Sequence, residues 1–263
     1  HQIGPEIYEA ICDDGQLFLG DWLFSMAAFG ADAPDVEAQF LVQHRGAIDR
    51  FLEKVGKLKD YLLELRDKEV PAYIERMIQT IPWHEFKAVG FTSTFQQNVP
   101  SFALATRIKS AFPSITTLFG GANFADEMGV ELVRSIRCID YAIVGEADIA
   151  FPELLIALQE KRDPSLIAGV VCRSEGGVEQ KRPPKLFTQM NDLPIPDYDE
   201  YFERAEALGL LTKGPRRQVM IPFESARGCW WGQKQHCTFC GLNGNGMAFR
   251  SKSPQRLREE LSK

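Results

Sequence analysis

Short apolar runs alternate with helix-like stretches between residues 88 and 172, and this alternation most constrains the fold. The apolar runs predict buried strands at 88–93, 116–119, 141–144 and 169–172. The stretches between them predict helices at 101–111, 126–137 and 151–159. Strands separated by helices of about ten residues tend to pair in parallel, with the helices packed on the sheet. We therefore predict an α/β domain at residues 85–185, built on a parallel, doubly wound sheet.

Residues 1–84 carry a helical pattern instead. Ile7 to Ile11 and Trp22 to Ala28 predict short helices, and apolar residues from Pro34 to Trp83 recur every three or four positions. Pro71 is expected to end or kink one of these helices, because proline lacks the N–H that a helix interior needs. We predict a packed helical layer that is part of the N-terminal domain or inserted in it. A partner-binding helix is the alternative.

Prolines mark a boundary after the α/β domain. The pair Pro183-Pro184 and the run L-P-I-P-D-Y at 193–198 predict a linker at 186–211, followed by a second domain at 212–263. In that domain, residues 218–223 predict a strand, and Ser253 with Pro254 predicts the capped start of a helix. These elements are too few to bury a core, and the first residue is His. We expect a piece of a longer protein with a truncated second domain.

Charge and composition exclude several classes. The chain has 263 residues and a net charge of −6, but residues 212–263 hold ten Lys+Arg and three Glu, a net of +7, which leaves −13 for residues 1–211. Such a basic end attracts anions, although a solvated surface explains it equally well. Without an arginine-rich run we expect no nucleic-acid partner. Without a secretory signal or an apolar run of about 18 residues we expect a cytoplasmic protein with no membrane partner.

Polar and glycine residues follow the first three strands, at the sheet edge where α/β proteins bind ligands. Glycine lets a ligand approach the backbone closely, and hydroxyls donate hydrogen bonds. Tight strand-to-helix turns are the alternative explanation of the glycines. No G-x-G-x-x-G motif opens the domain, which argues against a dinucleotide. The candidate cofactor-binding residues are Thr92, Ser93, Thr94, Gly120, Gly121, Gly145 and Glu146.

Three cysteines lie within twelve residues, in the spacing C-x7-C-x2-C: Cys229, Cys237 and Cys240. The two-residue gap lets two sulfurs reach one metal centre, and thiolates are soft ligands that suit iron–sulfur clusters or zinc. Three thiolates leave the fourth iron of a [4Fe–4S] cluster open. A zinc site that includes His236 and a disulfide with one thiol left over remain alternatives. The spacing favours an iron–sulfur cluster.

This segment, R-G-C followed by C-T-F-C-G, resembles the radical S-adenosylmethionine (SAM) enzymes. Their usual first gap is three residues, whereas here it is seven. The long gap with W-W-G, followed by C-T-F-C-G-L-N-G, looks like the subfamily that matures ribosomally made peptides such as bacteriocins and carries an N-terminal cobalamin-binding domain. The run L-P-I-P-D-Y and the V-G-E strand end are similar to cobalamin-dependent members. The resemblance covers about residues 85–263.

The resemblance implies a cobalamin-binding, Rossmann-like sheet followed by the start of a radical SAM (β/α) partial barrel. The candidate residues at the sheet edge would line the corrinoid. The three cysteines would hold [4Fe–4S], SAM would chelate the open iron, Phe239 would pack near the cofactor and Gly241 would approach SAM. No D-x-H-x-x-G motif is present, so no histidine is assigned to cobalt.

The activity implied is reductive cleavage of SAM to a 5′-deoxyadenosyl radical, with an electron from a donor such as flavodoxin or ferredoxin. Hydrogen abstraction and a modification such as C-methylation of a precursor peptide would follow. A zinc-stabilised binding module and a corrinoid carrier without radical chemistry remain alternative classes. With most of the barrel absent, we expect this chain to be inactive alone. No catalytic side chain is assigned.

Overall fold

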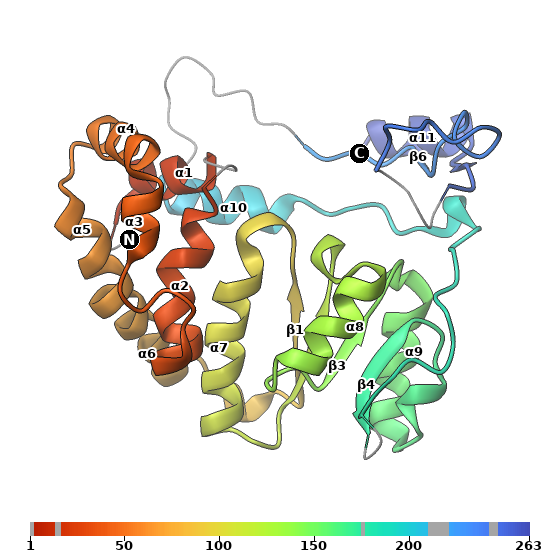
Figure 1. Cartoon of the computed structure of the whole chain (residues 1–263). Coiled ribbons are helices and arrows are strands. Elements are labelled where there is room, and N and C mark those ends of the chain that lie inside the picture. Colours follow the sequence, from red (N-terminus) through yellow and green to blue (C-terminus); the bar gives the residue numbers. More distant parts are fainter. Residues whose placement is uncertain (1–2, 14–16, 175–176, 210–220, 242–246) are drawn as a thin grey trace. The chain divides into compact units, whose positions relative to one another are not determined.

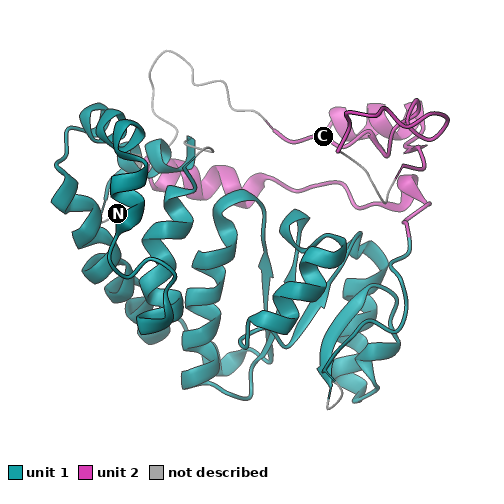
Figure 2. Ribbon diagram, viewed as in Figure 1, with its two compact units in different colours: residues 1–185 teal, residues 186–263 magenta. Residues whose placement is uncertain are grey.

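The computed structural model describes residues 3–13, 17–174, 177–209, 221–241 and 247–263. Two compact units make up the chain, His1–Lys185 and Leu186–Lys263 (Figure 2). The first unit holds the helical layer together with the sheet, and the second holds the cysteine segment. No described helix combines the length and the hydropathy needed to cross a membrane.

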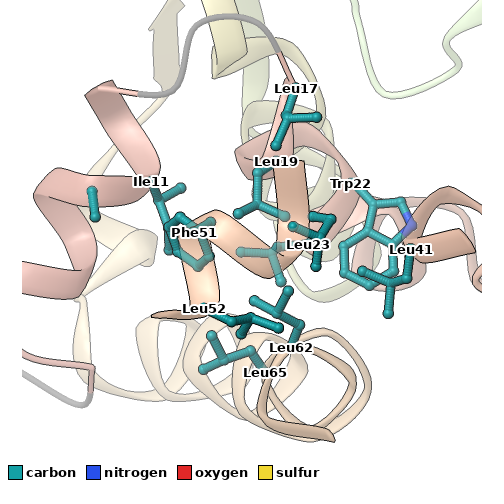
Figure 3. Packing of buried hydrophobic residues seen from close by; sticks show 12 residues of the cluster. Ile11, Leu17, Leu19, Trp22, Leu23, Leu41, Phe51, Leu52, Leu62 and Leu65 are labelled. Carbon is teal, nitrogen blue, oxygen red and sulfur yellow. The ribbon is translucent and has the colours of Figure 1, made fainter. Parts of the chain in front are cut away.

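The helical layer precedes the sheet, as the apolar spacing predicts. Its helices are α1 (Pro5–Asp13), α2 (Leu19–Phe29), α3 (Gln39–Gln43), α4 (Arg45–Val55), α5 (Lys59–Glu64) and α6 (Val70–Thr80). The apolar faces of α1 to α5 share one core, in which Leu19, Leu41 and Leu62 are almost wholly buried (Figure 3). Ile78 of α6 belongs to a separate core with Trp83 and Ile108. The predicted break at Pro71 takes the form of a π-helical turn, Leu65–Glu69, directly before α6. A wider turn relieves the clash between a proline ring and the carbonyl four residues earlier.

Three parallel strands follow in the predicted places: β1 (Ala88–Thr92), β2 (Thr116–Gly120) and β3 (Tyr141–Ile143). The helices between and after them are α7 (Asn98–Ala111), α8 (Asp126–Ser135) and α9 (Ala147–Glu160) (Figure 1). Phe102 of α7 and Val133 of α8 share a core with Phe119, so both helices cover one face of the sheet. Leu154 of α9 packs with Leu118 on the opposite face. Alternate residues of a strand point to opposite faces, which explains why Leu118 and Phe119 enter different cores.

The prediction of an all-parallel, doubly wound sheet is wrong beyond β3. The fourth strand, β4 (Val170–Ser174), runs antiparallel to β3 and forms a hairpin with β5 (Gly177–Glu179), which the sequence analysis did not predict. Strand order follows chain order, so this five-stranded sheet has no point at which the order reverses. The cause is the path of the chain after α9. The backbone of Val144 donates to the carbonyl of Gly169 (2.8 Å), which places the start of β4 beside the end of β3.

The second unit contains α10 (Asp199–Ala207), β6 (Ala226–Arg227), β7 (Arg250–Ser251) and α11 (Pro254–Leu261). Of the strand predicted at 218–223, residues 218–220 lie outside the described ranges and 221–223 form no strand, which is consistent with Pro222 lacking a ladder donor. The cap of α11 is confirmed, because the Ser253 hydroxyl accepts from the N–H of Arg256. β6 and β7 pair antiparallel. The start of a parallel (β/α) barrel therefore stays a prediction.

Candidate functional site

The loop after β1 uses one of its predicted ligand residues internally. Thr92 ends β1 and is exposed, but Ser93 is fully buried. The Ser93 hydroxyl donates to Asn98 Oδ1 (2.7 Å) and accepts from Asn123 Nδ2 (3.1 Å). Both of its hydrogen-bonding roles are thus satisfied within the protein. Thr94 begins a capping box with Gln97, so its backbone N–H is occupied as well.

Gly121 is required where the loops after β1 and β2 meet. Its φ is +97°, and a Cβ atom there would lie 2.5 Å from the Ser93 carbonyl oxygen. No L-residue fits such a position without moving the backbone. Gly120 pairs with Thr92 in the sheet register, and a Cβ atom there would lie 3.7 Å from the Ile143 carbonyl oxygen, which is an ordinary van der Waals contact. The structure brings Thr92, Ser93, Gly120 and Gly121 together.

Gly145 and Glu146 lie at the end of β3, against a different segment. Gly145 has φ +86°, and a Cβ there would lie 2.9 Å from Pro184 Cβ, so the proline pair packs on this strand end. Glu146 lines a cavity of about 630 Å³ together with Ile149, Ala150, Glu153, Arg162, Asp163, Leu166, Ile167, Ala168, Arg182 and Lys185. Hydrogen bonds from Ser165 lower the pKa of Asp163, which keeps that carboxylate ionised. Glu146 therefore belongs to a charged cavity beside α9.

Several residues that position the sheet edge were missed by the sequence analysis. Asn98 and Asn123 hold Ser93, and Gln96 reaches the helical layer, where its Oε1 accepts from the N–H of Gly20 (2.8 Å). The run Gln96-Gln97-Asn98 and the asparagine two residues after Gly121 are the signals that could have found them. Amide side chains that follow buried strands often hydrogen-bond nearby backbone groups.

The cysteine segment begins directly after β6. Gly228, with φ +76°, turns the chain into Cys229, whose sulfur accepts from the N–H of Gly232 (3.2 Å). The N–H of Cys240 donates to the carbonyl of Cys237 (3.1 Å), so one turn carries both of these thiols. All six cysteines of the chain are free, and these three are half-buried. The disulfide alternative is therefore not what the structure shows.

The three thiols do not converge in this conformation. Within the described residues, no group of three or more His, Cys, Asp or Glu side chains is arranged to hold a metal ion. His236, the candidate fourth zinc ligand, places its Nε2 3.1 Å from the carbonyl oxygen of Cys240. The donor set matches an iron–sulfur cluster in chemistry, but binding one requires this segment to close.

Aromatic side chains around the cysteines face solvent. Phe239 is 90% exposed, and an added Cβ at Gly241 would meet no atom within 4 Å. Lys234 lies 4.0 Å from the ring centre of Trp230, and Trp231 is also exposed. The two predicted SAM contacts, Phe239 and Gly241, are accessible.

No family model matches the chain. The chain is 28% identical over 180 residues to an uncharacterized methyltransferase of Pyrococcus horikoshii, an alignment that covers 66% of this chain and 36% of the relative. It is also 21% identical over 197 residues to an anaerobic magnesium-protoporphyrin IX monomethyl ester cyclase of Synechocystis, covering 75% of this chain and 36% of the relative. The chain thus matches little more than a third of the length of either relative. Both relatives are named as enzymes, and the more similar of these two is named as a methyltransferase.

Proposed function

We propose that this chain is the cofactor-binding part of a radical SAM methyltransferase. Cys229, Cys237 and Cys240 hold a [4Fe–4S] cluster, and SAM occupies the iron that the protein leaves open. The observation that carries this proposal is the C-x7-C-x2-C segment with its three free, half-buried thiols. The similarity to a methyltransferase and to a cyclase supports an enzyme of this kind.

The local geometry suits thiolate ligands. The N–H of Gly232 donates to the sulfur of Cys229, so the backbone already supplies an outer hydrogen bond to one of the proposed ligands. Cys237 and Cys240 share one turn, so Cys229 has to approach them as residues 230–236 rearrange. When bound, the cluster supplies the electron that cleaves SAM. Phe239 and Gly241 are accessible for contacts with SAM.

We further propose that a corrinoid binds at the carboxyl edge of β1, β2 and β3. Thr92, Gly121 and Gly145 are exposed along this edge, and Gly120 lies beside Thr92 in the sheet register. Thr94 and Glu146 lie on the same loops, whereas Ser93 acts by shaping the loop. These loops contain no histidine, so they offer no imidazole to cobalt. A precursor peptide as the methyl acceptor, and flavodoxin or ferredoxin as the electron donor, rest on the resemblance alone.

Anaerobic reconstitution with iron and sulfide tests the cluster. We expect the wild-type chain to bind about four irons and to show a broad iron–sulfur absorption shoulder. Cys237→Ala should lose both, whereas Cys12→Ala, which removes an exposed thiol outside the segment, should keep them. If the chain instead binds stoichiometric zinc and shows no iron chromophore, the proposal is wrong and the chain is a zinc-stabilised binding module. Equal iron in wild type and Cys237→Ala would exclude the assigned ligands.

A further inference from the structure

Phe95 is an exposed aromatic residue in a strained backbone conformation. Its side chain is 83% exposed, and its φ is +49°, in the left-handed region that non-glycine residues seldom occupy. Both features oppose folding, since the residue leaves a ring in water and strains its own backbone. Strain of this kind persists where the surrounding structure imposes it, and it gathers at ligand sites.

The surrounding loop imposes this conformation. The Phe95 carbonyl accepts from Asn123 Nδ2 (2.9 Å), which ties it to the loop after β2. On either side, the N–H of Thr94 donates to Gln97 Oε1 (2.9 Å), and Gln96 Oε1 accepts from Gly20 of the helical layer (2.8 Å). The backbone that carries Phe95 is thus held from three directions, and the ring is presented outward by a braced loop.

The position of Phe95 indicates what such a ring can do. It follows β1 at the carboxyl edge of the parallel strands, the edge on which α/β sheets carry their ligand-binding loops, although the strand order of this sheet has no reversal. The exposed residues beside it on the next loop, Gly121 and Ala122, are small. One aromatic ring beside small residues and exposed backbone suits a large, flat ligand that lies across the edge and packs against the ring face.

We propose that Phe95 is a ligand-contacting residue that packs against the flat macrocycle of a corrinoid at this edge. The inference rests on the corrinoid part of the proposed function and adds a residue to which no role is otherwise assigned. The braced loop explains why the strained conformation is kept: the backbone that carries the ring is positioned before the ligand arrives, so little backbone freedom is lost on binding. Asn123 and Gln96 are the positioning residues of this platform.

Binding of hydroxocobalamin to the 263-residue chain, measured by equilibrium dialysis and cobalamin absorbance, tests the proposal. Phe95→Asn removes the ring but suits positive φ, so the chain should stay folded while affinity falls about tenfold. Phe95→Trp keeps a flat ring and should bind within about threefold of wild type. Leu58→Asn replaces an 81%-exposed apolar side chain of the helical layer with the same residue and should leave affinity unchanged.

The outcomes separate this inference from the proposed function. Wild-type binding with unchanged affinity in Phe95→Asn would overturn the inference and leave the corrinoid proposal standing. Equal losses in Phe95→Asn and Leu58→Asn would assign the effect to general surface change and would also overturn it. A wild-type chain that binds no hydroxocobalamin would overturn the corrinoid proposal and this inference together, while the cluster proposal would still depend on iron reconstitution.

Discussion

Asp21 in the first turn of α2 accepts a hydrogen bond from the backbone N–H of Val99 in the first turn of α7, with 3.1 Å between Oδ1 and N. The two residues are 78 positions apart in the chain. The first N–H groups of a helix have no partner within the helix, so Asp21 caps α7 from a neighbouring element. Together with the bond between Gly20 and Gln96, this contact lets the helical layer hold the loop at the sheet edge.

Two replacements of Asp21 should distinguish how much its hydrogen bond and its charge each contribute to stability. Asp21→Ala leaves the N–H of Val99 without its acceptor and should lower the free energy of unfolding by about 1 kcal/mol, the usual effect of losing a helix cap. Asp21→Asn keeps an acceptor oxygen and should lose less than Asp21→Ala. Urea unfolding at pH 7 followed by circular dichroism measures both. Equal losses in the two variants would mean that the charge, not the acceptor, matters.

The same pair predicts a pH dependence. Burial raises the pKa of Asp21 above its usual 3.8, and the hydrogen bond from Val99 lowers it by less. A raised pKa means that the folded state prefers the protonated carboxyl, so the stabilising effect is present at low pH and is lost as the pH rises through the folded pKa. The stability of wild type relative to Asp21→Asn should therefore increase as the pH falls from 7 to 4. A flat difference between the two would contradict the burial of Asp21.

Gly121→Ala should be strongly destabilising. The new Cβ would lie 2.5 Å from the Ser93 carbonyl oxygen, at φ +97°, so steric overlap and backbone strain act together. We expect a loss of about 2–4 kcal/mol in the free energy of unfolding. Gly90→Ala is the control, because a Cβ at Gly90 meets nothing within 4 Å, and it should change stability by about 0.5 kcal/mol or less. Similar losses in both variants would show that the approach of Gly121 to Ser93 is not what excludes a side chain.

The helical layer depends on its buried leucines. Leu62 has no exposed surface and packs in the core of the layer (Figure 3), so Leu62→Ala should lower the free energy of unfolding by about 3 kcal/mol through lost burial and a cavity. Leu58→Ala, at a position that is 81% exposed, should cost about 0.5 kcal/mol or less. Chemical denaturation of both variants measures the difference. A small loss of stability in Leu62→Ala would contradict the burial of Leu62 in this core.

A buried ion group joins β7 to α11 in the second unit. Lys252 Nζ lies 2.8 and 2.7 Å from the two Glu260 oxygens, and Arg256 Nε lies 2.9 Å from Oε1. The side chains of Lys252 and Glu260 are almost fully buried. Glu260→Gln leaves Lys252 buried without a counter-charge and should lower the free energy of unfolding by about 3 kcal/mol. Glu259→Gln, at the exposed neighbouring position, should be close to neutral.

Glu260 should also make this unit sensitive to acid. The hydrogen bond from Lys252 lowers the pKa of Glu260 below its usual 4.5. A lowered pKa contributes stability above the unfolded value, and this stability is lost as the pH falls through the folded pKa. The difference between wild type and Glu260→Gln should shrink below about pH 4.5, as followed by tryptophan fluorescence during urea unfolding. If the stability difference between wild type and Glu260→Gln grew as the pH fell, the pKa of Glu260 would have to be raised, not lowered, in the folded state.

Much of the fold follows from local pattern. The three- and four-residue spacing of apolar residues predicts the helices of the first 84 residues, and the alternation after residue 88 predicts three strands in the right places. The cap at Ser253 follows from two adjacent residues. In each case the information lies within a few positions, because hydrophobic period and capping are properties of one element. The cysteine spacing is local in the same way, and it is the main support for the cluster proposal.

Only the tertiary structure decided how these elements meet. The direction of β4 depends on the return of the chain to Val144, and the hydropathy of residues 169–172 is the same for either direction. The burial of Ser93 depends on Asn98, on Asn123 and on the close approach of Gly121. The hydrogen bonds that link Gly20 and Asp21 to the sheet edge connect residues more than 70 positions apart in the chain. Local sequence determined which helices and strands could form, whereas long-range packing and hydrogen bonds decided strand direction, which polar side chains are satisfied internally, and why Phe95 is held facing solvent.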